Sequence, residues 1–345
     1  MTQVLCAMSG GVDSSVAAAL LLEAGHDVVG VTMKLWGGDS DTGCCSVSDV
    51  DDARRVAQQL GIDHHVFNFG DDFDAHVVAP FVDAHRHGRT PNPCIECNRH
   101  LKFDKLLRRA DALGFDAVAT GHHARITERA DGVRRIARGA DAAKDQSYVL
   151  YMLGQPQLAR TLLPVGHRTK DAVRADAARL GLRTAAKPDS QDVCFITSAA
   201  GRTGFVGDRA DLTPGVVVDE RGARVGTVAA VELVTIGQRR GLGIAGGSGA
   251  PQYVVHVDLP SATVVVGDET ALRTPTALLG DVTWSDQPVT GDVLAQCSAH
   301  GAARPARYDA SSGVLNWNEP QRRVAPGQAV VLYDGDEVVG GGMAR

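Results

Sequence analysis

The sequence predicts an α/β fold, with an N-terminal parallel-sheet domain followed by two small antiparallel β domains, the last of them barrel-like. Apolar runs and helical stretches alternate through roughly the first 200 residues, which is typical of a parallel sheet covered by helices. From about Gly204 on, helical periodicity fades and Gly, Val and Thr dominate between turn residues, which indicates antiparallel strands. A chain of 345 residues favours two or three domains. We place them at 1–203, 204–273 and 274–345.

The composition favours a cytoplasmic protein with reduced thiols. The chain is 44% hydrophobic and 22% charged, as in soluble globular proteins. It contains no run of 18 apolar residues and no N-terminal signal pattern, so we expect no membrane partner. Seven cysteines, an odd number, argue against a disulfide scaffold. The net charge of −6 excludes RNA binding through bulk charge alone but leaves room for a local basic groove.

The first strand-to-helix junction carries the strongest functional signal. An apolar run, Val4–Met8, leads into the sequence SGGVDSS at residues 9–15, and an Ala- and Leu-rich helix follows. The two glycines allow a close backbone approach, and the start of the helix presents unpaired N–H groups to an anion. Either of the last two serines can cap the helix. An ordinary capped turn is the alternative, but the full motif favours phosphate binding, although it matches neither the Walker nor the dinucleotide pattern.

The remaining elements of the N-terminal domain place further candidates beside this junction. Ligands of open parallel sheets bind at the carboxyl ends of the strands. Met33, Gly121 and His122 follow such strands, and a core methionine or a turn-closing histidine is the alternative for two of them. The expected order of elements is strand 27–33, helix 49–60, strand 64–69, helix 72–85, polar loop 86–100, helix 98–113 and strand 116–120.

Four cysteines raise the possibility of a metal site. Cys94 and Cys97 form a C-x-x-C pair in the polar loop, a spacing found in zinc sites, in redox motifs and in sequences with neither role. A structural zinc site needs a second pair of ligands. Cys44 and Cys45 could supply it, but adjacent cysteines lack the usual chelating spacing. We therefore expect no metal.

The other three cysteines differ in their surroundings. Cys6 and Cys297 lie in apolar strand sequence, which favours packing in a core. Cys194 follows a proline, two aspartates and a serine, which places it on a polar loop or its edge. A thiol there is accessible, and a nearby cation or helix end would lower its pKa. Cys194 is thus the best candidate for a reactive thiol.

Seven segments, in this order and spacing, resemble the tRNA-specific 2-thiouridylase family of PP-loop ATP pyrophosphatases. They are SGGVDSS, VTMKLW, GCCSVSDVDDARRVAQQLGI, GRTPNPCIECNRHLKF, ATGHHAR, KDQSYVLYML and PDSQDVCFI. Later segments such as TIGQRRGLGI and APGQAVVLYDGDEVVGGG are similar to the β domains of this family, so the resemblance covers essentially the whole chain. It implies a PP-loop domain that cleaves ATP between its α- and β-phosphates.

The resemblance implies ATP-dependent sulfur transfer to carbon 2 of the wobble uridine of tRNA, which forms 2-thiouridine. ATP, bound with Mg²⁺, adenylates the 2-oxygen of the uracil, and Asp13 can help to hold the Mg²⁺ ion. The resemblance implies no tightly bound cofactor. A persulfide on Cys194 then delivers sulfur, and Cys97 completes the exchange, which requires the two thiols to approach as in a disulfide. Cys94 stands where the family often has aspartate, so its role stays open. The implied partners are tRNA and a persulfide-donating sulfur-relay protein.

Further site residues follow from the same resemblance. The implied ATP-binding residues are Ala7, Met8, Ser9, Gly10, Gly11, Val12, Asp13, Ser14, Met33 and Gly121. The implied tRNA-binding residues are Asn92, Pro93 and Cys94 at the target base, with His122, Lys144, Asp145, Gln146, Arg307, Tyr308 and Gln328 elsewhere. Cations between residues 86 and 109 suit RNA phosphates, although a solvated helix face explains Lys105, Arg108 and Arg109 equally well.

Two other functions stay open as alternatives. One is a PP-loop ligase or amidotransferase that adenylates a small molecule and adds nitrogen, which would need neither Cys97 nor Cys194. The other is a nucleotide-binding module without activity, whose C-x-x-C pair holds zinc. Substitution of Cys194 tests the first alternative, and stoichiometric zinc without ATP consumption would support the second.

Overall fold

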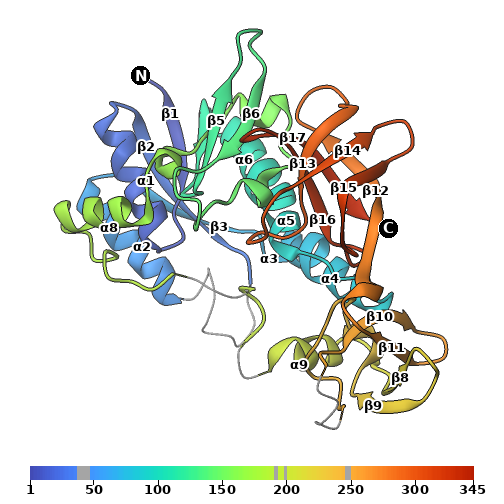
Figure 1. Cartoon of the computed structure of the whole chain (residues 1–345). Helices are drawn as coiled ribbons and strands as arrows, with labels where there is room; N and C mark the ends of the chain where they lie inside the picture. The colour runs from blue at the N-terminus through green and yellow to red at the C-terminus, as the bar shows by residue number, and fades with distance from the viewer. Residues whose placement is uncertain (37–46, 190–192, 198–199, 245–249) are drawn as a thin grey trace.

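The computed structural model describes residues 1–36, 47–189, 193–197, 200–244 and 250–345 (Figure 1). Its N-terminal part contains a parallel sheet, as predicted, and the strand order of this sheet is β3-β2-β1-β4-β7. Successive side chains of β1 point to opposite faces of this sheet, so that Val4 and Cys6 enter one apolar cluster while Leu5 and Ala7 enter another. The strands are β1 (Gln3–Ala7), β2 (Asp27–Lys34), β3 (His64–Asn68), β4 (Ala117–Ala119) and β7 (Thr161–Leu162).

Helices cover both faces of the sheet. On the face of Val4, the helices α1 (Val12–Glu23), α2 (Val47–Leu60) and α8 (Lys170–Arg179) supply the apolar partners. On the opposite face lie two longer helical segments, each built of three pieces with a π-helical middle. They are α3 (Gly70–Phe73), η1 (Asp74–Val78) and α4 (Ala79–Arg86), and then α5 (Pro93–Glu96), η2 (Cys97–Lys105) and α6 (Leu106–Ala112).

The loop predicted for residues 86–100 is wrong in its second half, because the helix already begins at Pro93. Asn92 is the N-cap, and its side chain accepts a hydrogen bond from Cys94 N at 3.0 Å. Proline at the first helical position loses no hydrogen bond, and its fixed φ suits a helix. The polar and proline-containing sequence therefore starts a helix rather than interrupting one, and it places Cys97 within the helical segment.

The middle of the chain forms a small mixed sheet in the order β10-β11-β8-β9. Its pairs are antiparallel except β8 with β11, which run parallel, so the expectation of a purely antiparallel domain is corrected in this detail. The elements are α9 (Gly201–Gly207), β8 (Gly215–Asp219), β9 (Arg224–Val228), η5 (Val231–Leu233), β10 (Tyr253–Asp258), β11 (Thr263–Gly267) and η6 (Thr270–Leu272).

The C-terminal strands close into a barrel, because β12 pairs with both β15 and β17. The barrel encloses its own apolar core, which confirms the predicted barrel-like architecture. Its strands are β12 (Arg273–Trp284), β13 (Gly291–Gln296), β14 (Arg304–Asp309), β15 (Val314–Arg322), β16 (Ala329–Asp334) and β17 (Glu337–Ala344). Cys297 follows β13 rather than lying in it.

A hairpin of the N-terminal part extends the barrel sheet. The strands β5 (Ala124–Glu128) and β6 (Arg134–Arg138) pair with each other, and Ala137 of β6 pairs with Glu337 of β17 (Figure 1). The Glu337 carboxylate also accepts hydrogen bonds from Thr127 at 2.7 Å and from Arg129 at 3.1 Å. The first and last parts of the chain therefore share one continuous sheet.

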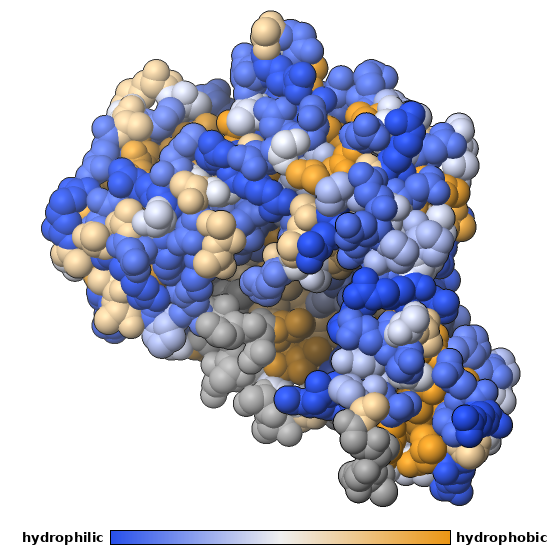
Figure 2. All heavy atoms as spheres, in the orientation of Figure 1, coloured by the Kyte–Doolittle hydropathy of each residue, from blue (hydrophilic) through white to orange (hydrophobic). Residues whose placement is uncertain are grey.

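Short elements complete the structure, namely η3 (Ser147–Leu150), α7 (Gln155–Leu158) and η4 (Pro164–His167). None of the helices in the described ranges has the length and apolar character needed to cross a membrane. The face shown in Figure 2 is largely hydrophilic over the N-terminal part, and it is hollowed between that part and the middle sheet. Apolar side chains are visible at the back of this hollow and over the middle sheet.

Candidate functional site

The SGGVDSS segment forms the turn between β1 and α1. Gly10 adopts a φ of +75°, a conformation that favours glycine. Gly11 is the N-cap of α1, and no described side chain caps the helix, so the predicted serine cap is wrong. Instead, the hydroxyls of Ser14 and Ser15 donate to Gly11 O at 3.2 and 2.8 Å. The first N–H groups of α1 thus lack a side-chain partner, which suits an anion.

Two neighbours fix this turn in place. A Cβ atom on Gly10 would collide with the backbone of Asp49 in α2, and one on Gly121 would lie 2.6 Å from Ser14 N. On the Asp49 side, the Lys187 ammonium donates to Gly10 O at 3.0 Å and to the Asp49 carboxylate at 2.6 Å. The turn is therefore held between α2 and the end of β4. Lys187 was not identified from the sequence.

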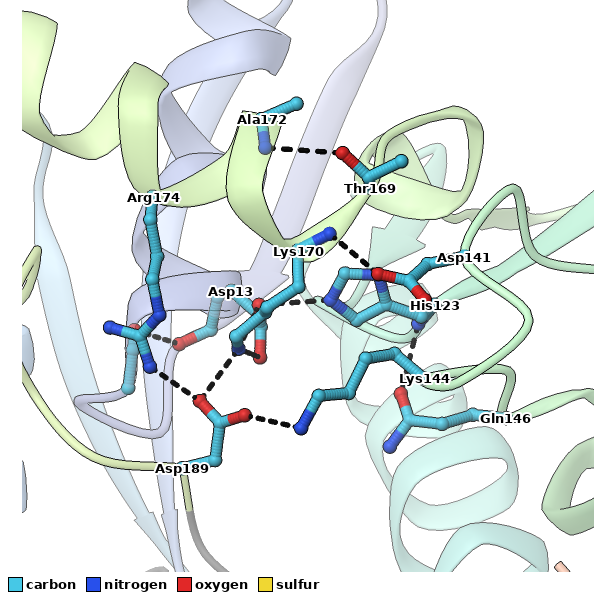
Figure 3. Close-up of polar contacts among 12 residues, drawn as sticks. Asp13, His123, Asp141, Lys144, Gln146, Thr169, Lys170, Ala172, Arg174 and Asp189 are labelled. Atoms are coloured by element: carbon cyan, nitrogen blue, oxygen red, sulfur yellow. Dashed lines mark hydrogen bonds and ion pairs between the residues drawn. The ribbon is translucent and has the colours of Figure 1, made fainter. Parts of the chain in front are cut away.

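Asp13, the second residue of α1, is the centre of a charged network (Figure 3). Its carboxylate accepts hydrogen bonds from Lys170 Nζ at 2.7 Å to each oxygen and from His123 Nε2 at 3.0 Å. Burial raises the pKa of Asp13, but the hydrogen bonds from His123 and Lys170 outweigh it and the pKa is lowered. Asp13 is thus a carboxylate with its two oxygens already engaged.

Asp189 joins this network from the segment that leads to Cys194. Its carboxylate accepts from Lys144 at 2.8 Å and Arg174 at 2.9 Å, and it lies 2.8 Å from Lys170 Nζ (Figure 3). Burial opposes ionisation, yet the hydrogen bonds from Lys144 and Lys170 lower the pKa of Asp189 to about 2. Lys170, Arg174 and Asp189 were missed from the sequence, because single charged residues in a polar stretch carry no spacing signal.

The residues expected to bind tRNA fall into two groups by exposure. Lys144 is partly exposed, and Arg307 is exposed on β14, where it pairs with Asp292 at 3.3 Å. By contrast, Tyr308 packs in the barrel core with its ring 5.7 Å from that of Trp284. Its side chain supports the barrel wall beneath Arg307.

Asp145 and Gln146 hold the backbone near His123. The Asp145 carboxylate accepts from Gly139 N at 2.9 Å and from both the N–H and the hydroxyl of Ser147, at 3.1 and 2.7 Å. Gln146 Oε1 accepts from His123 N at 2.9 Å. The hydrogen bonds of Asp145 and Gln146 therefore fix the backbone on the C-terminal side of Lys144, and the bond from His123 N links this segment to a residue of the Asp13 network.

His122 and Gln328 have partners within the protein. Nδ1 of the buried His122 lies 2.7 Å from Thr120 Oγ1, and burial holds the pKa of His122 well below its usual range. His122 is thus a neutral imidazole. Gln328 Oε1 accepts from Ala325 N at 3.2 Å. Met33 is half-buried on β2 and packs against the same apolar cluster as Cys97.

The described cysteines differ in burial. Cys94 is exposed on the first turn of α5, while Pro93 and Cys97 are buried. Asn98 Nδ2, next to Cys97, donates to Val149 O at 3.0 Å and ties this helix to η3. Cys194 is half-buried and borders the apolar cluster that contains Cys97.

Phe195 anchors Cys194. Its ring centroid lies 5.4 Å from Phe81, 5.6 Å from Phe73 and 5.0 Å from Phe205, and Phe205 belongs to α9. The contacts with Phe73 and Phe81 are edge-to-face and the one with Phe205 is tilted, and such contacts add to the apolar burial of the rings. Cys194 therefore adjoins an aromatic cluster that joins the N-terminal part to the middle of the chain.

Three further observations concern parts of the molecule outside this centre. Burial raises the pKa of Cys6 and that of Cys297 to about 12. Cys6 is buried in the core as predicted, whereas Cys297 is half-buried and packs against the barrel core. Among the described residues, no group of three or more His, Cys, Asp or Glu is arranged to hold a metal ion, while Cys44 and Cys45 lie outside the described residues. The basic residues Lys105, Arg108 and Arg109 line a cleft of about 820 Å³ beside β3.

Comparisons with known proteins cover the chain from end to end. Three family models match in succession: the tRNA methyl transferase HUP domain at residues 2–198, the tRNA methyl transferase PRC-barrel domain at 203–268 and the aminomethyltransferase beta-barrel domain at 284–344. A tRNA-specific 2-thiouridylase MnmA of Roseiflexus sp. (strain RS-1) is 48% identical, over 99% of each chain. One of Chloroflexus aurantiacus (strain ATCC 29366 / DSM 635 / J-10-fl) is 46% identical, over 99% of this chain and 98% of the relative.

Among solved structures, the U34-tRNA thiolase NcsA from Methanococcus maripaludis, determined with its [4Fe-4S] cluster, is 21% identical. The match covers 60% of this chain and 63% of that one, with a TM-score of 0.37.

Proposed function

The chain belongs to the tRNA-specific 2-thiouridylase family, and from this premise we propose that it converts the wobble uridine of tRNA to 2-thiouridine by ATP-dependent sulfur transfer. The substrates are tRNA and ATP. We place the reaction in the cytoplasm, with a persulfide-donating relay protein as the source of sulfur. The observation that carries the proposal is the uncapped start of α1 behind Gly10 and Gly11, next to the Asp13 network.

On the ATP side, the proposed first step activates the base. The 2-oxygen of the uracil attacks the α-phosphorus, the bond to the bridging oxygen breaks, and pyrophosphate leaves with the electron pair. The base then carries AMP, a far better leaving group than an oxide. The N–H groups of α1 support binding of the phosphates.

Mg²⁺ enters with ATP as part of the substrate. The residues around Asp13 fit a direct metal ligand poorly, because both of its carboxylate oxygens already accept hydrogen bonds from Lys170. Asp13 fits better as the anchor of a lysine cation, and we route no step through a metal held by Asp13. Met33 and Gly121 are further proposed contacts of the nucleotide, and Gly121 lies against the backbone of Asp13 and Ser14.

On the sulfur side, the terminal sulfur of a Cys194 persulfide attacks carbon 2. Cys97 attacks the Cys194 sulfur, the persulfide bond breaks, and AMP departs with the former 2-oxygen, which leaves a carbon–sulfur double bond. Cys97 and Cys194 end as a disulfide, which a thiol reductant reopens. Their place at one apolar cluster supports this exchange. The role of Cys94 stays open.

For tRNA, we propose that Asn92, Pro93 and Cys94 border the target base, and that His122 lines the same site. Lys144, Gln146, Arg307 and Gln328 are the further proposed contacts. Asp145 and Tyr308 serve by holding their neighbours, since the Asp145 carboxylate is engaged within the protein and Tyr308 is buried. A flipped base in a loop is the form in which an enzyme can reach carbon 2.

The test is mass spectrometry of nucleosides from unmodified tRNA incubated with the protein, ATP, Mg²⁺ and a persulfide source. We expect 2-thiouridine that requires ATP, and we expect Cys194→Ser to abolish it while the tRNA is still adenylated and pyrophosphate is still released. Cys297→Ser is the matched control. Burial raises the pKa of the Cys297 thiol, and this thiol packs against the barrel core, so we assign it no part in the reaction. Thiolation by the Cys194→Ser protein would refute its role. ATP cleavage without thiolation by the unaltered protein would point to the small-molecule ligase.

A further inference from the structure

We propose that Cys94 is the thiol that reopens the disulfide between Cys97 and Cys194, and that an external dithiol protein then reduces the resulting Cys94–Cys97 disulfide. The inference rests on the proposed function, in which each round of sulfur transfer ends with Cys97 and Cys194 joined. It gives a role to Cys94, which the steps of sulfur transfer do not use, and it names the class of partner that restores the enzyme.

The backbone brings Cys94 and Cys97 together at the start of the helical segment. Cys97 N donates hydrogen bonds both to Pro93 O and to Cys94 O. The second is the i→i+3 bond of a 3₁₀ turn, in which side chains three residues apart are eclipsed. Cys94 N donates to Asn92 Oδ1 at 3.0 Å, so a small shift of Cys94 disturbs the cap rather than the interior of the helix. A disulfide, which needs a Cβ separation of about 3.5–4.5 Å, can therefore form here with a local adjustment.

Exposure separates the three thiols. Cys94 is exposed, whereas Cys97 is only 8% exposed and Cys194 is half-buried. Cys97 belongs to an apolar cluster of the N-terminal part, and Cys194 packs against that cluster. In thiol–disulfide exchange the attacking thiolate must reach one sulfur of the disulfide, so the rate depends on access. A protein reductant therefore reaches Cys94 more readily than a disulfide that joins Cys97 and Cys194.

The other described cysteines do not offer this route. Cys6 is buried within β1, and Cys297 packs against the barrel core. The C-x-x-C spacing of Cys94 and Cys97 is one that redox motifs use. An exposed cysteine three residues before a buried one can carry electrons from the surface to the site of sulfur transfer.

The exchange balances without an external oxidant. The Cys94 thiolate attacks Cys97 Sγ, the bond between Cys97 and Cys194 breaks, and Cys194 leaves as a thiolate that can be loaded with sulfur again. A thiolate of the external dithiol then attacks Cys94 Sγ, and Cys97 leaves as a thiolate. The second thiol of the reductant attacks the mixed disulfide, and Cys94 leaves. The reductant ends as a disulfide, and its two protons pass to the regenerated thiols.

The first measurement asks whether Cys94 and Cys97 form a disulfide. The Cys194→Ser protein is oxidised with diamide, alkylated, digested with trypsin and examined by mass spectrometry. We expect the peptide of residues 90–99, which contains both cysteines, to lose two hydrogen atoms and to resist alkylation. The double variant Cys94→Ser/Cys194→Ser is the control and should leave Cys97 open to alkylation after denaturation. Absence of the Cys94–Cys97 disulfide from oxidised Cys194→Ser would overturn the proposal.

The second measurement follows reduction of the Cys97–Cys194 disulfide by thioredoxin, in the full chain and without tRNA. For Cys94→Ser we expect the rate to fall roughly tenfold or more, because the protein reductant must then reach a shielded disulfide. The rate with tris(2-carboxyethyl)phosphine, a much smaller reductant, should fall far less. Cys297→Ser is the matched control and should be reduced as fast as the unaltered protein.

The outcomes separate this inference from the proposed function. If thioredoxin reduces Cys94→Ser as fast as the unaltered protein, it acts on the Cys97–Cys194 disulfide directly, and the proposal is overturned. An equal loss of rate with the phosphine would also overturn it, because the substitution would then have altered that disulfide itself. Failure of the unaltered protein to thiolate tRNA, or to form a Cys97–Cys194 disulfide, would instead refute the proposed function and the inference with it.

Discussion

Gly121 shows how closely the end of β4 approaches the phosphate-binding turn. An added Cβ would lie 2.6 Å from Ser14 N and 2.7 Å from Asp13 C, both of them backbone atoms that cannot swing aside. The φ of Gly121 is not in the left-handed region, so an L-residue would meet no other backbone penalty. Glycine is required here for space, because the start of α1 has to touch the neighbouring strand end.

Replacing Gly121 by alanine should therefore push the first turn of α1 out of place. We expect ATP affinity to fall roughly tenfold or more while the helical content stays unchanged. Equilibrium ATP binding and circular dichroism measure the two effects. Gly154→Ala is the matched control, since its Cβ would come no nearer than 3.5 Å to the flexible Gln157 side chain. Normal ATP affinity in Gly121→Ala would contradict this reading of the turn.

At the scale of single residues, the SGGVDSS motif was predictable from the sequence, but the residues that bond to its Asp13 were not. The SGGVDSS turn and the burial of Cys6 follow from local sequence, because strand, glycines and helix are adjacent in the chain. The residues bonded to Asp13, His123 and Lys170, lie 110 and 157 positions further on, where only the packing of α1, α8 and β4 unites them. Tyr308 points into the barrel and its neighbour Arg307 points outward, because successive side chains of a strand alternate between the two faces of a sheet. The sequence does not reveal the register of the barrel strands, so it does not show which of the two side chains is buried.

At the scale of elements, the helix that carries Cys97 depends on its start. Asn92 and Pro93 were expected to lie in a loop, but they form a helix cap and a first helical position. Local turn signals and helix-start signals use the same residue types, which explains the error. Four strands of the parallel sheet, β1 to β4, were predictable because their apolar runs are short and bounded by turns, whereas the two-residue β7 was not predicted.

Replacing Asn92 by alanine removes the cap and should lower the free energy of unfolding by about 1 kcal/mol. Asn92→Asp retains a capping oxygen and should leave stability nearly unchanged. Urea denaturation measures both. The two variants also distinguish the capping role of Asn92 from a contact with RNA. If Asn92→Asp lowers the affinity for tRNA without lowering stability, the loss reflects a contact with the target base. Equal stability of all three proteins would refute the capping role.

At the scale of the whole molecule, buried contacts join the middle sheet to the N-terminal part. The Phe195 cluster is one such contact, because Phe205 lies on α9, and the hydrogen bond between His85 on α4 and the backbone of Glu232 in η5 is another. Burial, and then the charge of Arg202, lower the pKa of His85 to about 4, against a partial opposing effect from the backbone of Glu232. Arg202 also donates to Leu233 O at 3.0 Å across the same junction.

The buried His85 should make the protein sensitive to mild acid. A folded pKa below the unfolded value near 6.5 means that the unfolded chain binds the proton more readily. The contribution is therefore complete above pH 6.5 and falls by up to about 3 kcal/mol as the pH approaches 4. Urea unfolding between pH 7 and 4 measures it, and His85→Gln should show a shallower decline. Identical pH slopes in the two proteins would contradict the assignment.

The order of an α/β part followed by β domains, and the barrel, were predictable from the change in residue pattern along the sequence. The domain boundaries at 203 and 273 stay predictions. The continuation of β17 into β6 was not predictable, because one pair of residues joins strands from opposite ends of the chain. Nothing in the alternating pattern of either strand specifies so distant a partner.

This shared sheet also bears on the order in which the chain is made. Ala137 leaves the ribosome 200 residues before its partner Glu337. At about 5–20 residues per second, the hairpin would wait on the order of 10–40 s for the strand that covers its edge. During that interval an open strand edge is available to wrong partners. A nascent chain stalled before β17 should thus be a better client for chaperones than the finished protein, and C-terminal truncation should harm the ATP-binding end as well as the barrel.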